Sequence, residues 1–365
     1  MRGVSYLRNV APSWWSLISA RRQKTGTGIA VLSTVWSHHA NQSGYHPVSK
    51  GLGVILPVHP TRLLPSAASR WIAGKGMERA YEIALAMKVA GCDRLLVIDG
   101  DFQLKLIECI RRITTVKIVG VFHQIPSVLE RCLAQVSPAL LDGAVCVARC
   151  QMPLVRSIAR EGHAWFVPHG VDVDYFGPGA PRSDQPVVLC VGSHYRDFDT
   201  LRKSADLIYQ TVPGVSVRLV ASPSLLPQGL NLGRVELLAG LSDEELLREY
   251  RRAWVVLLPL TDSTANNSLL EAIASGAPVV VSDVGGVRDY VGPDCGALCP
   301  VGDERTHAAR TIDLIFDAKG REAAGRAARA RAENYAWPIV REQIRSVVDD
   351  KKIPLASQSA GGRVS

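Results

Sequence analysis

Short apolar runs of strand length alternate with segments of helical hydrophobic period along most of this chain. Such alternation predicts parallel sheets, because the connection between two parallel strands crosses the sheet through a helix. Before residue 176 the expected strands are residues 29–35, 94–98, 116–122, 144–147 and 165–167. A second series follows at residues 187–191, 216–221, 235–239, 255–259 and 278–282. The pattern therefore predicts an α/β fold of two consecutive, doubly wound, Rossmann-like domains.

The stretch between the two series is rich in Gly and Pro and has no apolar period, which is typical of a linker. A length of 365 residues also suits two domains. The expected organisation is an N-terminal arm at 1–27, disordered or interfacial; a first domain at 28–175; a linker at 176–186; a second domain at 187–336; an amphipathic helix at 337–350; and a disordered tail at 351–365.

Composition narrows the class of protein. Apolar residues make up 47% of the chain and charged residues 21%, which is the balance of a folded globular protein. No apolar run approaches the roughly 18 residues that a membrane-spanning helix needs. The eight cysteines include no C-x-x-C pair, so we expect free thiols and a reducing, cytoplasmic setting.

Positive charge is concentrated in the first half of the chain. Residues 1–185 carry 21 Lys and Arg against 12 Asp and Glu, whereas residues 186–365 carry 21 against 22. Such asymmetry favours an anionic partner for the first half, such as a phosphate-bearing substrate, a nucleic acid or an anionic membrane surface. A basic surface that serves only solubility is the alternative.

The loop after the expected strand at 255–259 is the most informative for chemistry. Asn266, Asn267 and Ser268 are residue types that begin a helix, and Gly276 with Pro278 ends it. The first turn of such a helix has unbonded N–H groups and a positive dipole, so it is the expected anion site. Glu271 lies four residues after Asn267 and projects from the same face. A ribose diol is its expected partner; the alternative, a solvated helix residue, fits its apolar neighbours poorly.

Residues 267–290, which include S-L-L-E-A-I-A-S-G-A-P-V-V-V-S-D-V-G-G-V-R-D-Y, resemble the donor-binding motif of GT-B, family 4-type retaining glycosyltransferases. Three further segments resemble the same family in order: Phe122-His123, residues 167–176 and residues 191–201. The helix beginning Trp337-Pro338 is similar to the helix that returns to the first domain in that family. The resemblance covers residues 28–350 and implies two domains facing each other across a cleft.

The resemblance implies a nucleotide diphosphate sugar as donor substrate, no separate cofactor and no metal. It gives Glu271 the ribose and Arg196 the diphosphate; an ion pair of Arg196 with Asp197 or Asp199 is the alternative. His123 would lie beside the transferred sugar; a satisfied polar residue at a strand end is the alternative. The expected catalytic residues are thus His123, Arg196 and Glu271, and the expected donor-binding residues are Gly44, Asp262, Ser263, Asn266, Asn267, Ser268 and Leu269.

Two departures from the family pattern concern the donor. The family pairs two glutamates spaced E-x7-E, but Ser263 stands eight residues before Glu271, with Asp262 beside it as a substitute. Arg196 also lacks the lysine that usually accompanies it.

Asp99-Gly100-Asp101 imitates the D-x-D metal motif of single-domain transferases. A second complete domain with its own phosphate site argues against that mechanism. We expect these acids to cap the helix that follows them.

These observations predict a cytoplasmic hexosyltransferase of polysaccharide biosynthesis that acts with retention, with a glycan or a lipid-linked intermediate as acceptor and no nucleic-acid partner. The basic first half suggests peripheral contact with an anionic membrane at its inner face. Two alternatives stay open: a sugar-nucleotide-binding protein that does not catalyse, and an epimerase of the same fold.

Overall fold

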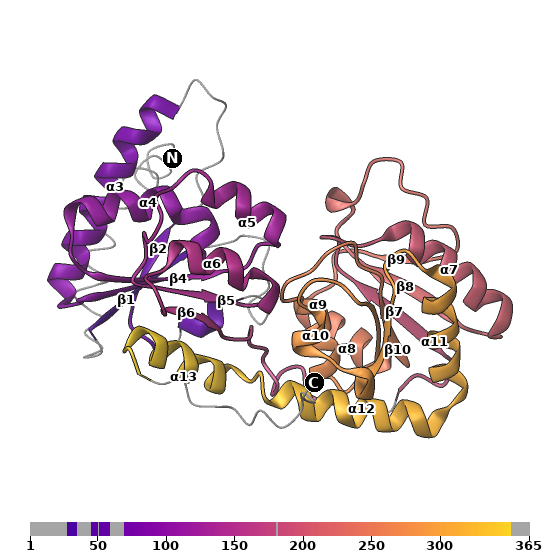
Figure 1. Cartoon of the computed structure of the whole chain (residues 1–365). Helices are drawn as coiled ribbons and strands as arrows, with labels where there is room; N and C mark the ends of the chain where they lie inside the picture. Colours follow the sequence, from indigo (N-terminus) through magenta and orange to yellow (C-terminus); the bar gives the residue numbers. More distant parts are fainter. Residues whose placement is uncertain (1–27, 35–44, 50, 59–68, 180–181, 352–365) are drawn as a thin grey trace, which may run out of the picture. The chain divides into compact units, whose positions relative to one another are not determined.

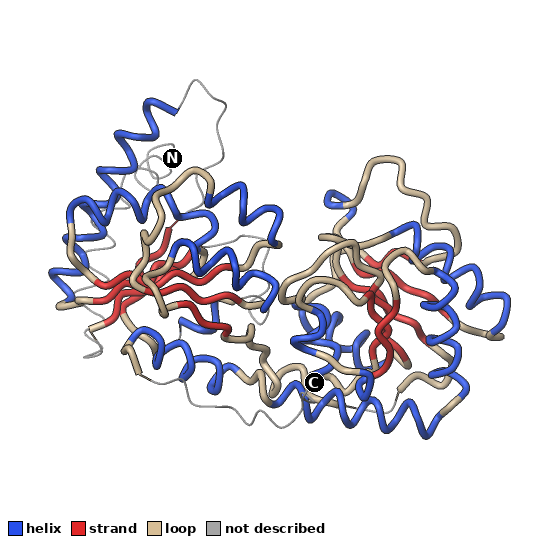
Figure 2. Tube along the Cα trace, viewed as in Figure 1, coloured by secondary structure: helices blue, strands red, loops and turns tan. Residues whose placement is uncertain are grey.

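The computed structural model describes residues 28–34, 45–49, 51–58, 69–179 and 182–351 (Figure 1). The chain divides into two units: residues up to 167 together with those from 341 onward form most of the first, and residues 168–340 form the second. Over the described residues each unit contains a parallel sheet of six strands with helices packed on its faces (Figure 2). The predicted α/β class with two doubly wound domains is confirmed.

In the first unit the strands follow the order β2-β1-β3-β4-β5-β6 across the sheet. The strands are β1 (Ile29–Thr34), β2 (Val54–Val58), β3 (Arg94–Val97), β4 (Lys117–Phe122), β5 (Gly143–Cys146) and β6 (Ala164–Phe166). The helices are η1 (His46–Ser49), α3 (Ser69–Ala90), α4 (Gly100–Ile113), α5 (Pro126–Leu133), η3 (Arg149–Gln151) and α6 (Met152–Ile158). Central strands are buried along nearly their whole length, which explains their continuous apolar runs.

In the second unit the order is β12-β11-β10-β7-β8-β9. The strands are β7 (Val187–Val191), β8 (Ser216–Val220), β9 (Glu236–Leu238), β10 (Val255–Leu258), β11 (Val279–Ser282) and β12 (Gly296–Cys299). The helices are α7 (Phe198–Thr211), η4 (Pro223–Leu225), α8 (Asp243–Arg252), α9 (Asn267–Ala274), α10 (Val287–Tyr290), η5 (Pro293–Cys295), α11 (Glu304–Phe316) and α12 (Ala318–Glu333). From β7 the chain adds β8 and β9 toward one edge of the sheet, and from β10 it adds β11 and β12 toward the other edge. The β7–β10 pair is therefore the switch point of the topology.

Helix α13 (Trp337–Val348) carries the chain from the second unit back to the first. Its later residues bond to the first unit: Arg341 Nη2 donates to the Pro47 carbonyl (3.3 Å) and Arg345 Nη2 to the Gly51 carbonyl (2.7 Å). Just beyond the helix, Asp349 forms an ion pair with Arg94, and Asp350 lies 3.3 Å from Lys117 Nζ. The first unit is thus completed by the C-terminal part of the described chain.

All eight cysteines fall in the described part of the chain and are free thiols, as expected. Burial raises the pKa of Cys190, Cys295 and Cys299 to about 11, so these three are un-ionised and weakly nucleophilic near neutral pH. Within the described ranges, no helix has both the length and the apolar character that crossing a bilayer requires.

A buried polar network ties β10 and β11 to α11. Ser282 Oγ accepts from the Leu260 N–H (2.9 Å) and lies 3.1 Å from His307 Nε2, while His307 Nδ1 donates to the Asp303 carbonyl (2.7 Å). With its proton on Nδ1, the neutral ring accepts from the Ser282 hydroxyl at Nε2. Burial lowers the pKa of His307 below 6.5, so the folded protein holds this ring neutral.

We expect His307 to make stability depend on pH. Because its pKa is lower in the folded than in the unfolded state, the unfolded state binds more protons below pH 6.5. The contribution of the neutral His307 ring to the free energy of unfolding should therefore be complete above pH 6.5. It should be lost as the pH falls from 6.5 toward the folded-state pKa. Urea unfolding at about pH 7.5 and about pH 5.5 measures this change. His307→Gln should lose stability at both pH values but show a smaller difference between them, and an unchanged difference would contradict the assignment.

Candidate functional site

The loops after β7 and β10 meet at the switch point of the second sheet. Arg196 and Leu260 form an isolated antiparallel bridge, in which the Asp197 N–H donates to the Pro259 carbonyl (3.0 Å) and the Thr261 N–H to the Tyr195 carbonyl (2.9 Å). Ligands in open α/β folds bind beyond the carboxyl ends of the strands at such a point. Arg196 and the start of α9 therefore lie where the topology favours a binding site.

Helix α9 begins as the sequence predicts. Asn266 is its N-cap, with its side-chain Oδ1 accepting from the Leu269 N–H (3.1 Å), and Asn267 is the first helical residue. Ser268 and Leu269 follow in the first turn and are buried. The N–H groups of a first turn have no partner within the helix, and together with the dipole they favour an anion. Of the three predicted capping residues, Asn266 makes the capping bond.

Arg196 is only 8% exposed and reaches the start of α9. Its Nη2 donates to Ser268 Oγ (3.1 Å) and to Asn266 Oδ1 (3.4 Å), and its Nε donates to the Val191 carbonyl (2.9 Å). A positive charge thus lies beside the helix end that already favours an anion. Burial lowers the pKa of the Arg196 guanidinium, an effect that the nearby Glu271 carboxylate opposes.

The alternative partners of Arg196 are engaged elsewhere. Asp197 caps α7 by accepting from the Thr200 N–H (3.0 Å). Asp199 pairs with Lys203 (2.6 Å) and Arg202 (3.1 Å) on the exposed face of the same helix. Arg196 consequently forms no ion pair with either aspartate in the structure.

Gly192, the residue after β7, makes the approach of Arg196 possible. Its φ of +93° lies in the region that glycine tolerates, and a Cβ atom there would lie 3.0 Å from Arg196 Nη2 and 3.3 Å from Ser268 Oγ. The sequence motif contains this glycine, but the contact it permits joins segments over 70 residues apart. A glycine directly after an apolar strand is the signal that could have identified it.

Glu271 is a buried carboxylate, 5% exposed, and not a solvated helix residue. The fully buried hydroxyl of Tyr250 on α8 donates to Glu271 Oε2 (2.9 Å). Burial raises the pKa of Tyr250 well above its ordinary value, and the charge of Glu271 raises it further. The tyrosine therefore stays protonated and orients the carboxylate. Nothing in the sequence around Tyr250 indicates this role.

The loop that carries Asp262 and Ser263 packs under the glycine pair after β11. Asp262 Oδ1 accepts from the Ser263 N–H (2.7 Å), and the Ser263 carbonyl accepts from the Gly286 N–H (2.9 Å). Gly285 has a φ of +54°, and a Cβ atom there would lie 1.9 Å from the Ser263 carbonyl oxygen. Gly285 is thus required for the two loops to meet.

We expect Gly285→Ala to displace the Ser263 loop and to destabilise the fold by about 1–3 kcal/mol through backbone strain, with a further loss from the clash. Thermal and urea unfolding measure the loss, and affinity for a nucleoside diphosphate reports on the loop. Gly240→Ala is the matched control, because Gly240 has a φ of +69° but no neighbour within 4 Å of an added Cβ. Equal losses for the two variants would contradict the packing argument.

In the first unit His123 follows β4 and is held in a fixed orientation. Its Nε2 lies 2.8 Å from the Ile98 carbonyl, which can only accept, so Nε2 donates in this bond. The Tyr45 ring lies edge-on at 4.6 Å between centroids. The expected Gly44 lies outside the described residues.

The prediction that the aspartates of the D-x-D lookalike cap α4 is wrong for Asp101. Asp99 is the N-cap residue of α4, but its side chain makes no capping bond. Asp101 is buried and accepts from the backbone N–H groups of His123 (2.7 Å) and Gln124 (3.2 Å). These amides lie just beyond the end of β4, and the carboxylate accepts from both of them. Among the described residues no cluster of three His, Cys, Asp or Glu side chains could hold a metal ion.

The structure therefore brings Arg196, Asn266, Ser268 and Glu271 together in the second unit, with Asp262 and Ser263 on the loop that leads to them. His123 belongs to the first unit.

Comparisons with known proteins agree with this geometry. The sequence family described as "Glycosyl transferases group 1" matches residues 185–317. The sulfoquinovosyl transferase SQD2 of Arabidopsis thaliana is 33% identical over 110 residues, 29% of this chain and 22% of that protein. The D-inositol 3-phosphate glycosyltransferase of Mycobacteroides abscessus is 31% identical over 204 residues, 48% of this chain and 44% of that protein. The chain thus matches less than half the length of these two relatives.

Solved structures share the fold over most of the chain. HepE of Anabaena in complex with UDP-glucose superposes with a TM-score of 0.68 at 14% identity, covering 88% of this chain and 99% of that one. Sucrose-phosphate synthase from Thermosynechococcus elongatus gives a TM-score of 0.65 at 19% identity, covering 95% and 92%. At these identities the likeness establishes the fold, which is the two-domain GT-B fold.

Proposed function

Because residues 185–317 belong to the Glycosyl transferases group 1 family, we propose that this protein transfers a sugar from a nucleotide diphosphate sugar to an acceptor, with retention at the anomeric carbon. The observation that carries this proposal is the position of the Arg196 guanidinium. It is buried, it bonds to Ser268 Oγ, and it lies beside the first turn of α9 at the switch point of the sheet. That combination suits a diphosphate.

The diphosphate is assigned to Arg196 and to the first turn of α9. Guanidinium N–H groups pair with phosphate oxygens at short range, and the amides after Asn266 add partial positive charge. Ser268 and Asn266, which Arg196 contacts, would exchange those bonds for bonds to the ligand. When the sugar departs, negative charge grows on the phosphate oxygens, so the same groups stabilise the transition state more than the bound donor.

The ribose is assigned to Glu271. A carboxylate accepts from both hydroxyls of a vicinal diol, and the Tyr250 hydroxyl fixes the orientation of this one. HepE, one of the structural neighbours, was solved in complex with UDP-glucose, which belongs to the proposed class of nucleotide diphosphate sugars. Asp262 and Ser263 are assigned to the sugar end of the donor, with Asp262 in place of the family's first glutamate.

The proposed reaction retains the configuration at the anomeric carbon. The bond between the anomeric carbon and the diphosphate oxygen breaks, and the acceptor hydroxyl oxygen forms its bond from the same side. The acceptor proton passes to an oxygen of the leaving diphosphate, and the products are a glycosylated acceptor and a nucleoside diphosphate. His123 is assigned to a hydroxyl of the transferred sugar, which would donate to Nδ1 because Nε2 is committed to the Ile98 carbonyl.

The acceptor is assigned to the first unit. Residues 1–185, which include most of that unit, carry the whole positive excess of the chain. A glycan or lipid-linked acceptor that bears an anionic group, at the surface of an anionic membrane, fits that charge. The D-inositol 3-phosphate glycosyltransferases among its relatives are named for an acceptor with such a group.

A binding protein without catalysis is the second candidate, and the observation that favours it is Ser263 in the place of an acid. A thermal-shift screen against nucleotide sugars identifies the donor, since a bound ligand raises the unfolding temperature. Release of nucleoside diphosphate with that donor and mixed acceptors then tests the proposal. A donor that stabilises the protein without any such release would favour the binding protein, and free sugar formed without an acceptor would favour an epimerase.

A further inference from the structure

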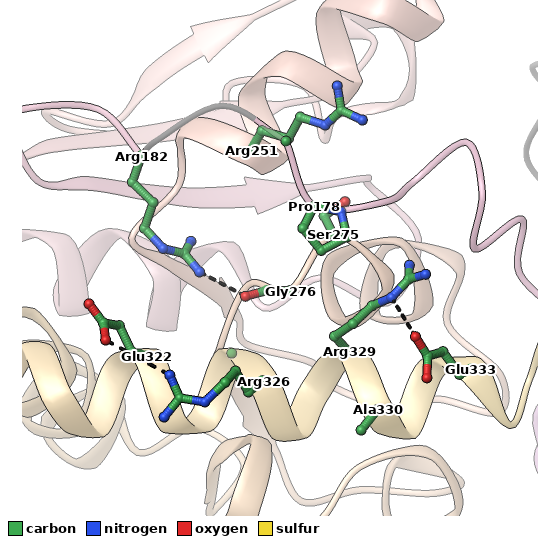
Figure 3. Close-up of a pocket in the computed structure, with 12 residues that line it drawn as sticks. Pro178, Arg182, Arg251, Ser275, Gly276, Glu322, Arg326, Arg329, Ala330 and Glu333 are labelled. Carbon is green, nitrogen blue, oxygen red and sulfur yellow. Dashed lines mark hydrogen bonds and ion pairs between the residues drawn. The ribbon is translucent and has the colours of Figure 1, made fainter.

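A cavity lies at the opposite end of α9 from the candidate donor site. It has a volume of about 430 Å³, is open to solvent, and is lined by the end of α9, the start of the second unit and helix α12 (Figure 3). The helix has eight residues, so its two ends are separated by about 12 Å. This volume lies within the range of small-molecule sites. The donor assignments leave this cavity without a role.

Positive charge dominates the lining. Four arginines and two glutamates contribute to it: Arg182, Arg251, Arg326, Arg329, Glu322 and Glu333. Both glutamates are paired within α12, Glu333 with Arg329 (3.1 Å) and Glu322 with Arg326 (3.9 Å). Over the described residues, Arg182 and Arg251 have no carboxylate within ion-pairing distance. The cavity therefore holds two guanidinium groups whose charge is not neutralised.

The bonds that Arg182 and Arg251 do make are to backbone carbonyls. Arg182 donates from Nη2 to the Gly276 carbonyl (2.7 Å) and from Nη1 to the Ala253 carbonyl, and Arg251 Nε donates to the Gly177 carbonyl (3.0 Å). Each guanidinium has five N–H groups, so donors remain for a ligand. Burial lowers the pKa of Arg182 and the neighbouring charge of Arg321 lowers it further, whereas the charge of Glu322 raises it. An anion in the cavity would act in the same direction as Glu322.

Ser275 adds an unsatisfied donor to the same lining. The residue is 5% exposed, it lines the cavity, and its buried Oγ has no hydrogen-bond partner in the structure. A buried hydroxyl without a partner is costly, so such groups indicate a bond that a ligand or water completes. Figure 3 places Ser275 beside Pro178, between the arginines of the lining.

The end of a helix carries partial negative charge, which by itself disfavours an anion. Here arginine side chains donate hydrogen bonds to the carbonyl groups at this end of α9. Arg329 Nη1 donates to the Ala274 carbonyl (2.9 Å), and Arg182 donates to that of Gly276. The negative end of α9 is thereby compensated, and the remaining groups offer mainly donors.

We propose that this cavity is a second ligand site, which binds the phosphate group of a small phosphomonoester through Ser275 Oγ, Arg182 and Arg251. A phosphate group supplies only acceptors and two negative charges, which matches the unpaired donors of the lining. The volume exceeds what the phosphate alone fills, and Pro178 and Ala330 provide apolar contact for the remainder of the molecule. The site is independent of sugar transfer, so it stands or falls separately from the proposed function.

Isothermal titration calorimetry on the full chain tests the proposal, with inorganic phosphate and mannose 6-phosphate as probes. Saturating nucleoside diphosphate is present throughout, so that the donor site is occupied. We expect saturable binding. Tighter binding of mannose 6-phosphate would identify a phosphomonoester as the natural ligand, and equal binding would identify free phosphate. At probe concentrations of about 10 mM, a Kd below about 10 mM would be detected. If neither probe binds under these conditions, the proposal is overturned.

Variants locate the binding. Ser275→Ala removes a hydroxyl that has no partner to lose, so the protein should fold normally and bind the probe about tenfold more weakly. Arg251→Gln should weaken binding by at least as much. Arg310→Gln is the matched control, since it removes an exposed positive charge from α11 of the same unit. Unchanged affinity in both cavity variants would overturn the proposal, even if the wild-type chain binds phosphate.

Discussion

Substitution of Arg196 by methionine should lower kcat for sugar transfer by about a hundredfold to a thousandfold, the usual loss when one preorganised donor to a developing oxyanion is removed. Methionine retains much of the buried apolar volume of the arginine stem but none of its N–H groups. The bond from Nη2 to Ser268 Oγ and the charge beside α9 disappear together. Nucleoside diphosphate release at saturating donor measures kcat.

A loss of folding must be separated from a loss of chemistry, because Arg196 also bonds to the Val191 carbonyl. Urea unfolding of each variant supplies that comparison. Arg196→Lys keeps the charge and should recover part of the rate, although it lacks the paired N–H geometry. Arg202→Met is the matched control, since Arg202 pairs with Asp199 and Asp206 on the exposed side of α7. A folded Arg196→Met protein with wild-type kcat would refute the assignment of the diphosphate to this residue.

Substitution of Glu271 by glutamine should reduce kcat/KM for the donor by about a hundredfold. The carboxylate is assigned two hydroxyl donors from the ribose, and each hydrogen bond to a charged group contributes about 1.5–3 kcal/mol. The amide keeps the shape of the side chain but accepts at one oxygen only. Initial rates at low donor concentration measure kcat/KM. Tyr250→Phe should give a smaller loss of about tenfold, because it removes the hydroxyl that orients the carboxylate and leaves its charge in place.

A donor that lacks the ribose 2′-hydroxyl makes the Glu271 test specific. The wild-type protein should prefer the normal donor over the 2′-deoxy donor, and Glu271→Gln should reduce that preference. Glu244→Gln, at an exposed position of α8, is the control for a lost negative charge. If Glu271→Gln lowers kcat/KM but keeps the full preference for the 2′-hydroxyl, the carboxylate does not bind the ribose at that position.

The alternation of apolar runs was sufficient to locate ten strands to within one residue at each end, because strands buried on both faces are continuously apolar. The two strands that the pattern missed, β2 and β12, both lie at an edge of their sheet. β2 contains Pro57, and Pro is compatible with a strand only at such an edge. β12 is the short run Gly296–Cys299, whose first three residues are only partly buried. The edge strands β6 and β9 were located, so the miss at β2 is attributed to Pro57 and the miss at β12 to its short, partly buried run.

Capping chemistry, which is local, placed the start of α9 within residues 266–268, and the structure has Asn266 as the N-cap. The same reasoning failed at Asp101, because the backbone amides that it bonds belong to His123 and Gln124, in the loop that follows β4. Sequence separation is the difference between the two cases. A cap joins residues three apart, whereas the partners of Asp101 are reached only through the pairing of β3 with β4.

The sequence by itself thus determined which elements form, that they alternate into two parallel sheets, and that a polar helix start follows a buried strand. Only the tertiary structure decided which side chains meet there: Arg196 with Ser268, Tyr250 with Glu271, and Gly285 with the Ser263 carbonyl. Periodicity and capping act over a few residues and are written in the local sequence. Contacts between loops depend on the order of strands across the sheet, because this order decides which distant segments become neighbours. The strand order is stabilised by burial of apolar surface across the whole domain and not by any local segment.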